Sequence, residues 1–63
     1  MKQITQTTVA SGVIGQFNHE WAVVMLHDQK YDSRSYELFI GEEHIVSVAS
    51  VVEALAVLVG EFS

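Results

Sequence analysis

The chain has 63 residues, neither cysteine nor proline, and a formal net charge of −5 from eight acidic and three basic residues. This length allows a single small domain, residues 1–63, and the missing cysteines exclude disulfides and thiolate metal sites. The acidic balance makes nucleic acid an unlikely partner, the polar stretch after Met1 lacks the features of a secretory signal, and we expect a cytoplasmic protein that does not span a membrane.

The first expected element is a strand over about residues 2–17, because this segment is rich in threonine and in residues that favour strands. Gly12 and Gly15 enclose Val13 and Ile14, which indicates a bulge, a bend or an early turn. The segment is therefore read as one long bent strand or as two short ones. A turn is expected around Phe17, Asn18 and His19.

Residues 20–28 form the clearest strand. Its two faces can be read directly, because side chains alternate between the faces of a strand. One face holds His19, Trp21, Val23, Met25 and His27, and the other holds Glu20, Ala22, Val24, Leu26 and Asp28. Both faces are apolar in the middle. This pattern predicts a central strand that is covered on both sides.

Two hairpins follow from the next polar segments. Residues 29–35 predict a loop, residues 35–40 a returning strand, and residues 41–43 a turn into a short strand at 44–48. The sequence thus predicts an antiparallel sheet of three to five strands.

A helix is expected over about residues 50–60, which makes the fold class α+β. Ser50 and Glu53 fit a capping box, in which each side chain accepts from a free amide at the start of the helix, and Gly60 is a typical stop. Four valines lower the helix propensity of this segment, so a buried strand is the alternative.

The helix is expected to bury one stripe and to leave an unusually apolar opposite side. The inward stripe holds Val51, Leu55, Leu58 and Phe62, flanked by Val52 and Val59, and the opposite side holds Glu53, Ala56, Val57 and Gly60. A surface of small residues with one charge suits packing against a second helix. One helix also leaves the second face of the central strand uncovered. We therefore expect homodimerisation through Glu53, Ala56, Val57 and Gly60, the alternative being a monomer that tolerates exposed valine and alanine.

The histidines do not predict a metal site or a catalytic centre. His19 and His27 stand at opposite ends of one strand, too far apart to bind one ion, and neighbouring residues such as Glu43 and His44 point apart at a turn. The sequence contains no nucleophile elbow, phosphate loop or zinc motif. We expect no enzyme, no cofactor and no metal.

The segment between the central strand and its neighbour is the best candidate for binding a partner. It carries Lys30, Tyr31, Arg34 and Tyr36, and tyrosine and arginine are enriched at binding hot spots. An ordinary polar hairpin loop is the alternative.

Three functions fit these features. The first is a small acidic protein-binding module: a homodimeric regulator or inhibitor of a larger protein, of the general profile found among small inhibitors of mobile elements. The second is a dimer that binds single-stranded nucleic acid on sheet aromatics, namely Trp21, Tyr31, Tyr36 and Phe39. The third is a dimer that binds a small ligand or acts as a catalyst in a pocket between its subunits, with His27 or His44 as the titrating group.

Overall fold

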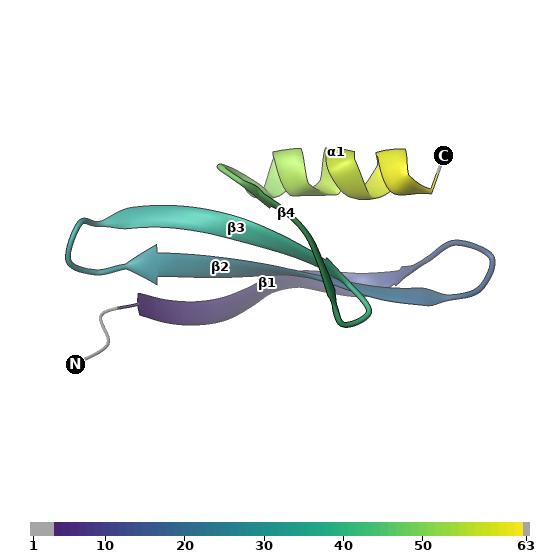
Figure 1. Ribbon diagram of the computed structural model, residues 1–63, viewed down its shortest axis with the longest axis horizontal. Coiled ribbons are helices and arrows are strands. Elements are labelled where there is room, and N and C mark those ends of the chain that lie inside the picture. The colour runs from purple at the N-terminus through teal and green to yellow at the C-terminus, as the bar shows by residue number, and fades with distance from the viewer. Residues whose placement is uncertain (1–3, 63) are drawn as a thin grey trace.

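The computed structural model describes residues 4–62. Four strands, β1 (Ile4–Ile14), β2 (His19–Asp28), β3 (Ser33–Ile40) and β4 (Glu43–Val48), precede one helix, α1 (Val51–Glu61) (Figure 1). The sheet order is β1-β2-β3-β4, and every neighbouring pair is antiparallel. The predicted α+β class is confirmed. Residues 2 and 3 of the first predicted strand lie outside the described residues.

The turns differ in position from the sequence prediction. β1 ends at Ile14 and not at residue 17, because the chain turns at residues 15–18, where Gly15 has φ 82° and Asn18 has φ 55°. The Asn18 amide donates to the Gly15 carbonyl at 3.1 Å. β3 starts two residues earlier than predicted, since Ser33 and Arg34 still pair with the end of β2 despite their polarity. β4 likewise starts at residue 43 instead of 44.

Two bulges shift the register of the sheet. The β1–β2 pairing skips Val9, between Thr8 and Ala10, and the β3–β4 pairing skips Ile45, since Leu38 is opposite Val46 whereas Phe39 is opposite His44. An extra residue bends its strand and changes which side chains lie opposite one another. Neither bulge is at Gly12 or Gly15, but the early turn that was one of the three readings of these glycines is present at Gly15.

The start of α1 confirms half of the predicted capping box. Ser50 is the N-cap and its hydroxyl accepts from the Glu53 amide at 3.2 Å, whereas the Glu53 carboxylate accepts from Ala49, one residue before the cap, at 3.2 Å. The predicted stop at Gly60 is wrong by one residue. The helix continues to Glu61, and the Phe62 amide donates a hydrogen bond to the Val59 carbonyl at 3.2 Å.

The hydrophobic core is small. Its fully buried members are Val23, Leu38, Ala54 and Leu58. Half-buried residues around them include Trp21, Tyr36, Val46, Leu55, Val57 and Phe62. Of the stripe predicted to face inward, Leu58 is buried and Val51, Leu55 and Phe62 are half-buried. Val57 was expected on the outward side, but it packs against the core because the buried stripe is centred on Ala54 and Leu58.

The helix covers only part of one face of the sheet. It packs on β3 and β4, at the edge of the sheet farthest from β1 (Figure 1). The molecule is elongated, with extents of 42 × 19 × 15 Å. β2 is an interior strand, as predicted, but within the described chain a layer lies over only one of its faces. The predicted cover on both sides is therefore not supplied by a single chain.

Candidate functional site

The side of the sheet opposite α1, here called the open face, is the first candidate site. Val23 and Leu38 point into the core under the helix, so the residues that alternate with them point the other way. The open face holds Ala22, Val24 and Leu26 on β2, Glu37 and Phe39 on β3, and His44 and Ser47 on β4. Its centre is an apolar strip on β2 that continues to Phe39, next to a polar cluster on β3 and β4.

Glu37 is the centre of that polar cluster. Its Oε2 lies 3.0 Å from His44 Nε2 and also accepts a hydrogen bond from the Ser47 hydroxyl. The Glu37 side chain is 18% exposed and that of His44 is 48% exposed. The Phe39 and His44 rings meet edge to face with centroids 5.3 Å apart. The bulge at Ile45 makes this arrangement possible, because it places His44 opposite Phe39 and beside Glu37.

The two hydrogen bonds favour the ionised form of Glu37. The Ser47 hydroxyl and then the His44 ring lower the pKa of the Glu37 carboxyl from its ordinary value of 4.5, while burial acts in the opposite direction. Both partners bind the same carboxylate oxygen, so the acid lies between the hydroxyl and the imidazole. In a nucleophilic triad the imidazole lies between the serine hydroxyl and the carboxylate, so that it can take the proton of the hydroxyl. The cluster fixes a negative charge on the open face and does not activate Ser47.

A shallow depression of about 360 Å³ lies near the turn that joins β1 to β2. It is lined by Ser11, Gly12, Val13, Glu20, Trp21, Ala22 and Gly41. Neither of the histidines proposed to titrate in an interface pocket, His27 or His44, belongs to this lining. The depression is therefore a hollow in the surface without a titrating imidazole.

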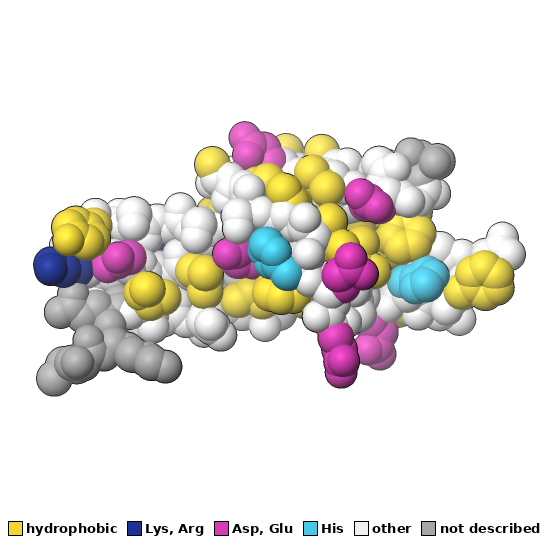
Figure 2. Space-filling view, in the orientation of Figure 1, with side chains coloured by type: hydrophobic (Ala, Val, Ile, Leu, Met, Phe, Trp, Pro, Cys, Tyr) yellow, Lys and Arg dark blue, Asp and Glu magenta, His cyan; other side chains and the backbone are white. Residues whose placement is uncertain are grey.

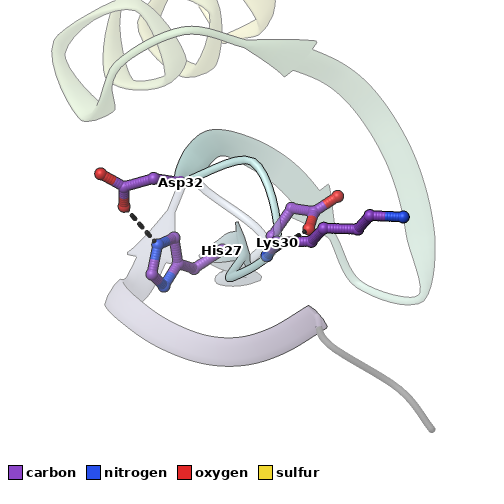
Figure 3. A network of polar contacts seen from close by, with 4 residues as sticks. His27, Lys30 and Asp32 are labelled. Atoms are coloured by element: carbon purple, nitrogen blue, oxygen red, sulfur yellow. Dashed lines mark hydrogen bonds and ion pairs between the residues drawn. The ribbon is translucent and has the colours of Figure 1, made fainter.

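The second candidate site is the tip of the β2–β3 hairpin, residues 28–34 (Figure 3). His27 Nε2 lies 2.9 Å from Asp32 Oδ1, and Asp28 Oδ1 accepts from the Lys30 amide at 3.0 Å. The hydrogen bond from His27, followed by the charge of Arg34, lowers the pKa of Asp32. These contacts stabilise the loop. Asp32, which lies within the loop, has a positive φ of 50°.

Three of the four residues predicted to bind a partner belong to this tip. Lys30, Tyr31 and Arg34 are exposed, and Lys30 Nζ lies 5.3 Å from the centre of the Tyr31 ring. Figure 2 shows a small dark-blue group, the colour of Lys and Arg, at one end of the molecule, with carboxylates both near it and farther along. The fourth residue, Tyr36, is half-buried within β3 and packs against the core. The structure therefore separates Tyr36 from the other three.

The predicted dimer residues lie on α1 with mixed exposure. Glu53, Ala56 and Gly60 are exposed, together with Val52 at 77% and Val59 at 60%, whereas Val57 is half-buried. Glu53 is also engaged at the cap. The exposed side of the helix is thus small and apolar, and its role as an interface remains a prediction.

The histidines are distributed over separate places. His19 stacks near Phe62, with ring centroids 5.3 Å apart, while His27 and His44 point to opposite faces of the sheet. Across residues 4–62 no group of three His, Asp or Glu side chains is arranged to hold a metal ion. In the same part of the chain no helix is long and apolar enough to cross a bilayer.

Comparison of the chain with models of known protein families, with curated proteins and with solved structures gives no match.

Proposed function

We propose that this chain is a small protein-binding module that acts as a homodimer and regulates or inhibits a larger protein. The observation that carries the proposal is the shortage of buried side chains. Four hydrophobic residues form the fully buried core of the described chain, although 49% of the sequence is hydrophobic. Large exposed hydrophobic residues are Ile4, Val9, Val13, Phe17, Tyr31, Val52 and Val59.

Association with a second copy and with the larger protein accounts for this excess. A chain of this length buries only about 60% of its unfolded surface and usually needs a second source of stability. Disulfides are excluded, since the sequence has no cysteine. The open face and the exposed side of α1 supply apolar surface for association with a second copy or with the larger protein. A cytoplasmic location, where an inhibitor meets intracellular targets, is part of the proposal.

The β2–β3 tip supports binding to a second, different protein. Lys30, Tyr31 and Arg34 combine positive charge with an aromatic ring at one end of an acidic chain. Arginine and tyrosine contribute strongly at interface hot spots. A partner with an acidic or hydrogen-bonding groove fits this tip.

The nucleic-acid alternative loses support from the arrangement of the aromatic residues. Trp21 and Tyr36 lie on the helix side of the sheet, Phe39 lies on the open face, and Tyr31 is in the loop. A platform for stacking bases needs several rings on one surface, along with basic side chains. We expect no binding to single-stranded oligonucleotides even at low salt.

Affinity measurements with a purified partner test the proposal. The tagged chain is used to recover the partner from its native cell, the partner is identified by mass spectrometry and purified, and its Kd is measured. We expect the double substitution Tyr31→Ala and Arg34→Ala to raise Kd at least about tenfold, in line with hot-spot truncation. Glu42→Gln, at the opposite turn, is the matched control and should leave Kd unchanged. An equal Kd for the double variant, or no recovered partner, contradicts the proposal.

A further inference from the structure

β1 is an edge strand with little protection against pairing. It is 11 residues long, joins β2 on one side, and has no strand of residues 4–62 on its other side. Its sequence contains no charged residue and no proline. An edge of this kind presents a row of backbone N–H and C=O groups that another strand can bind.

The opposite edge of the sheet carries the protection that β1 lacks. β4 has six residues, starts with Glu43 and His44, and contains the bulge at Ile45. α1 packs against it as well. Short length, charge, bulges and cover are the devices by which proteins block edge strands. The only such device on β1 is the bulge at Val9.

The geometry points to β1 as the seam of the homodimer, in which residues 4–8 pair antiparallel with the same residues of a second copy. This inference rests on the proposed function and names β1 as its dimer surface, in place of the exposed side of α1 that the sequence predicted. The twofold axis is normal to the sheet and passes near Gln6, so that Gln6 lies opposite Gln6 of the second copy. Such an axis places the backbone N–H and C=O groups of one β1 strand opposite the C=O and N–H groups of the second copy, so that the two strands can pair antiparallel.

Charge identifies the second copy as the occupant of this edge. Each chain has a formal net charge of −5, yet β1 contributes none of it. Two copies therefore meet along β1 without bringing carboxylates of that strand together. A charged peptide from another protein would find no opposite charge on this strand to select it.

The half of β1 before the bulge is better suited to pairing than the half after it. Val9 interrupts the pairing of β1 with β2. In the second half, Gly12 lies against Trp21, because a Cβ added at Gly12 would be 3.1 Å from the Trp21 ring. The first half contains Thr5, Thr7 and Thr8. Threonine favours strands, and threonine pairs across strands are stabilising. With Gln6 at the centre, Thr5 faces Thr7 of the second copy.

Pairing through β1 has a direct consequence for the open face. A twofold axis normal to the sheet keeps both helices on the same side and joins the two sheets into one. The strips formed by Ala22, Val24, Leu26 and Phe39 in each copy then belong to one continuous surface. The dimer presents twice the apolar area of one chain to a partner.

Opposite charges introduced at Gln6 test the seam. Sedimentation equilibrium over a dilution series should give a mass of twice 7.0 kDa for the wild-type chain. Q6K and Q6E each place two like charges opposite one another, and we expect each to raise the dimer Kd about fivefold or more. An equal mixture of Q6K and Q6E should restore the wild-type Kd. Recovery in the mixture shows that neither variant is misfolded.

The controls separate the seam from the proposed dimer itself. Ala56→Lys, on the exposed side of α1, should leave the dimer Kd unchanged, and amide exchange at residues 4–8 should slow as the protein concentration rises. If Q6K and Q6E dimerise like the wild type while Ala56→Lys weakens the dimer, the β1 seam is wrong and the homodimer stands. If the wild-type chain is monomeric at every concentration, the homodimer and the seam are both wrong.

Discussion

Glu37 is a charged residue in the middle of an otherwise apolar stretch, with Tyr36 before it and Leu38 after it. Its position on the open face gives it two partners from the neighbouring strand, Ser47 and His44. Because their contacts lower its pKa, the carboxylate is more stable in the folded chain than in the unfolded one. The free energy of unfolding therefore depends on the ionisation of this one group.

We expect the contribution of Glu37 to be complete above its ordinary pKa of 4.5 and to disappear as the pH falls through the lower pKa of the folded state. The unfolded chain binds the proton more readily over this interval, so stability falls with acidification. Ser47→Ala removes the larger of the two causes and should move the pKa of Glu37 back toward 4.5.

The measurements are a carboxyl NMR titration of Glu37 and urea unfolding between about pH 3 and pH 7. Ser33→Ala, at an exposed serine distant from the cluster, is the matched control. An unchanged Glu37 pKa in Ser47→Ala would show that the hydroxyl is not responsible for the shift.

Gly15 and Gly41 provide a matched pair for measuring backbone and packing costs separately. Both have positive φ, 82° and 63°, but an added Cβ at Gly15 would lie 3.1 Å from Phe62, whereas at Gly41 it meets nothing within 4 Å. We expect Gly41→Ala to cost about 1–2 kcal/mol for the left-handed backbone alone. Gly15→Ala should cost more, because Phe62 must also move. Equal costs in urea unfolding would contradict the packing contribution.

The sequence did not reveal the Glu37 cluster, and the reason is physical. Contacts between β3 and β4 depend on their register, and the bulge at Ile45 sets that register without an evident signal in the sequence. The sequence suggested His44 beside its neighbour Glu43 and in a pocket between subunits, but gave no sign that it lies beside Glu37. A carboxylate inside an apolar strand was the available clue, since such a group needs a partner. The β2–β3 tip was predictable because Lys30, Tyr31 and Arg34 are neighbours along the chain.

The elements themselves follow from local patterns wherever the pattern is strong. A continuous apolar run with polar ends identified β2, and the capping residues identified α1 in spite of its valines. The ends of β3 and β4 were less certain because polar residues such as Ser33 and Glu43 resemble a loop although they pair in the sheet. The bulge at Val9 had no glycine to mark it.

The cap of α1 gives a prediction for this element. Ser50→Ala removes the acceptor for the Glu53 amide, and we expect a loss of about 1 kcal/mol in the free energy of unfolding. Ser50→Asp keeps an acceptor at the N-cap and should retain nearly all of the stability. Denaturant unfolding followed by circular dichroism measures both. A loss of equal size in both variants would show that the hydroxyl contact does not stabilise the helix.

At the level of the whole molecule, a core of four fully buried side chains provides little stability for 63 residues. Leu38 is among the largest of them. Removing a buried leucine costs about 2–5 kcal/mol, which is comparable to the entire stability of a small domain. The folded chain is therefore expected to depend on its assembly.

We expect Tm to rise with protein concentration, because association stabilises only the folded chain. Differential scanning calorimetry over a hundredfold concentration range measures this, and Q6K should have a lower Tm than the wild type at high concentration. At the lowest concentration the two should converge. A Tm that is independent of concentration would mean that the chain folds without a partner.

The inequality of the two sheet edges also determines where assembly stops. Strand addition becomes a polymer when one edge binds a different edge of the next copy, since a free edge then always remains. When β1 pairs with β1 of a second copy, the unprotected sheet edge of both copies is occupied. What remains at each end is β4, with Glu43, His44, the bulge and the helix beside it. This arrangement favours a closed pair over a fibril, even though β1 has the length and neutrality that fibril-forming segments share.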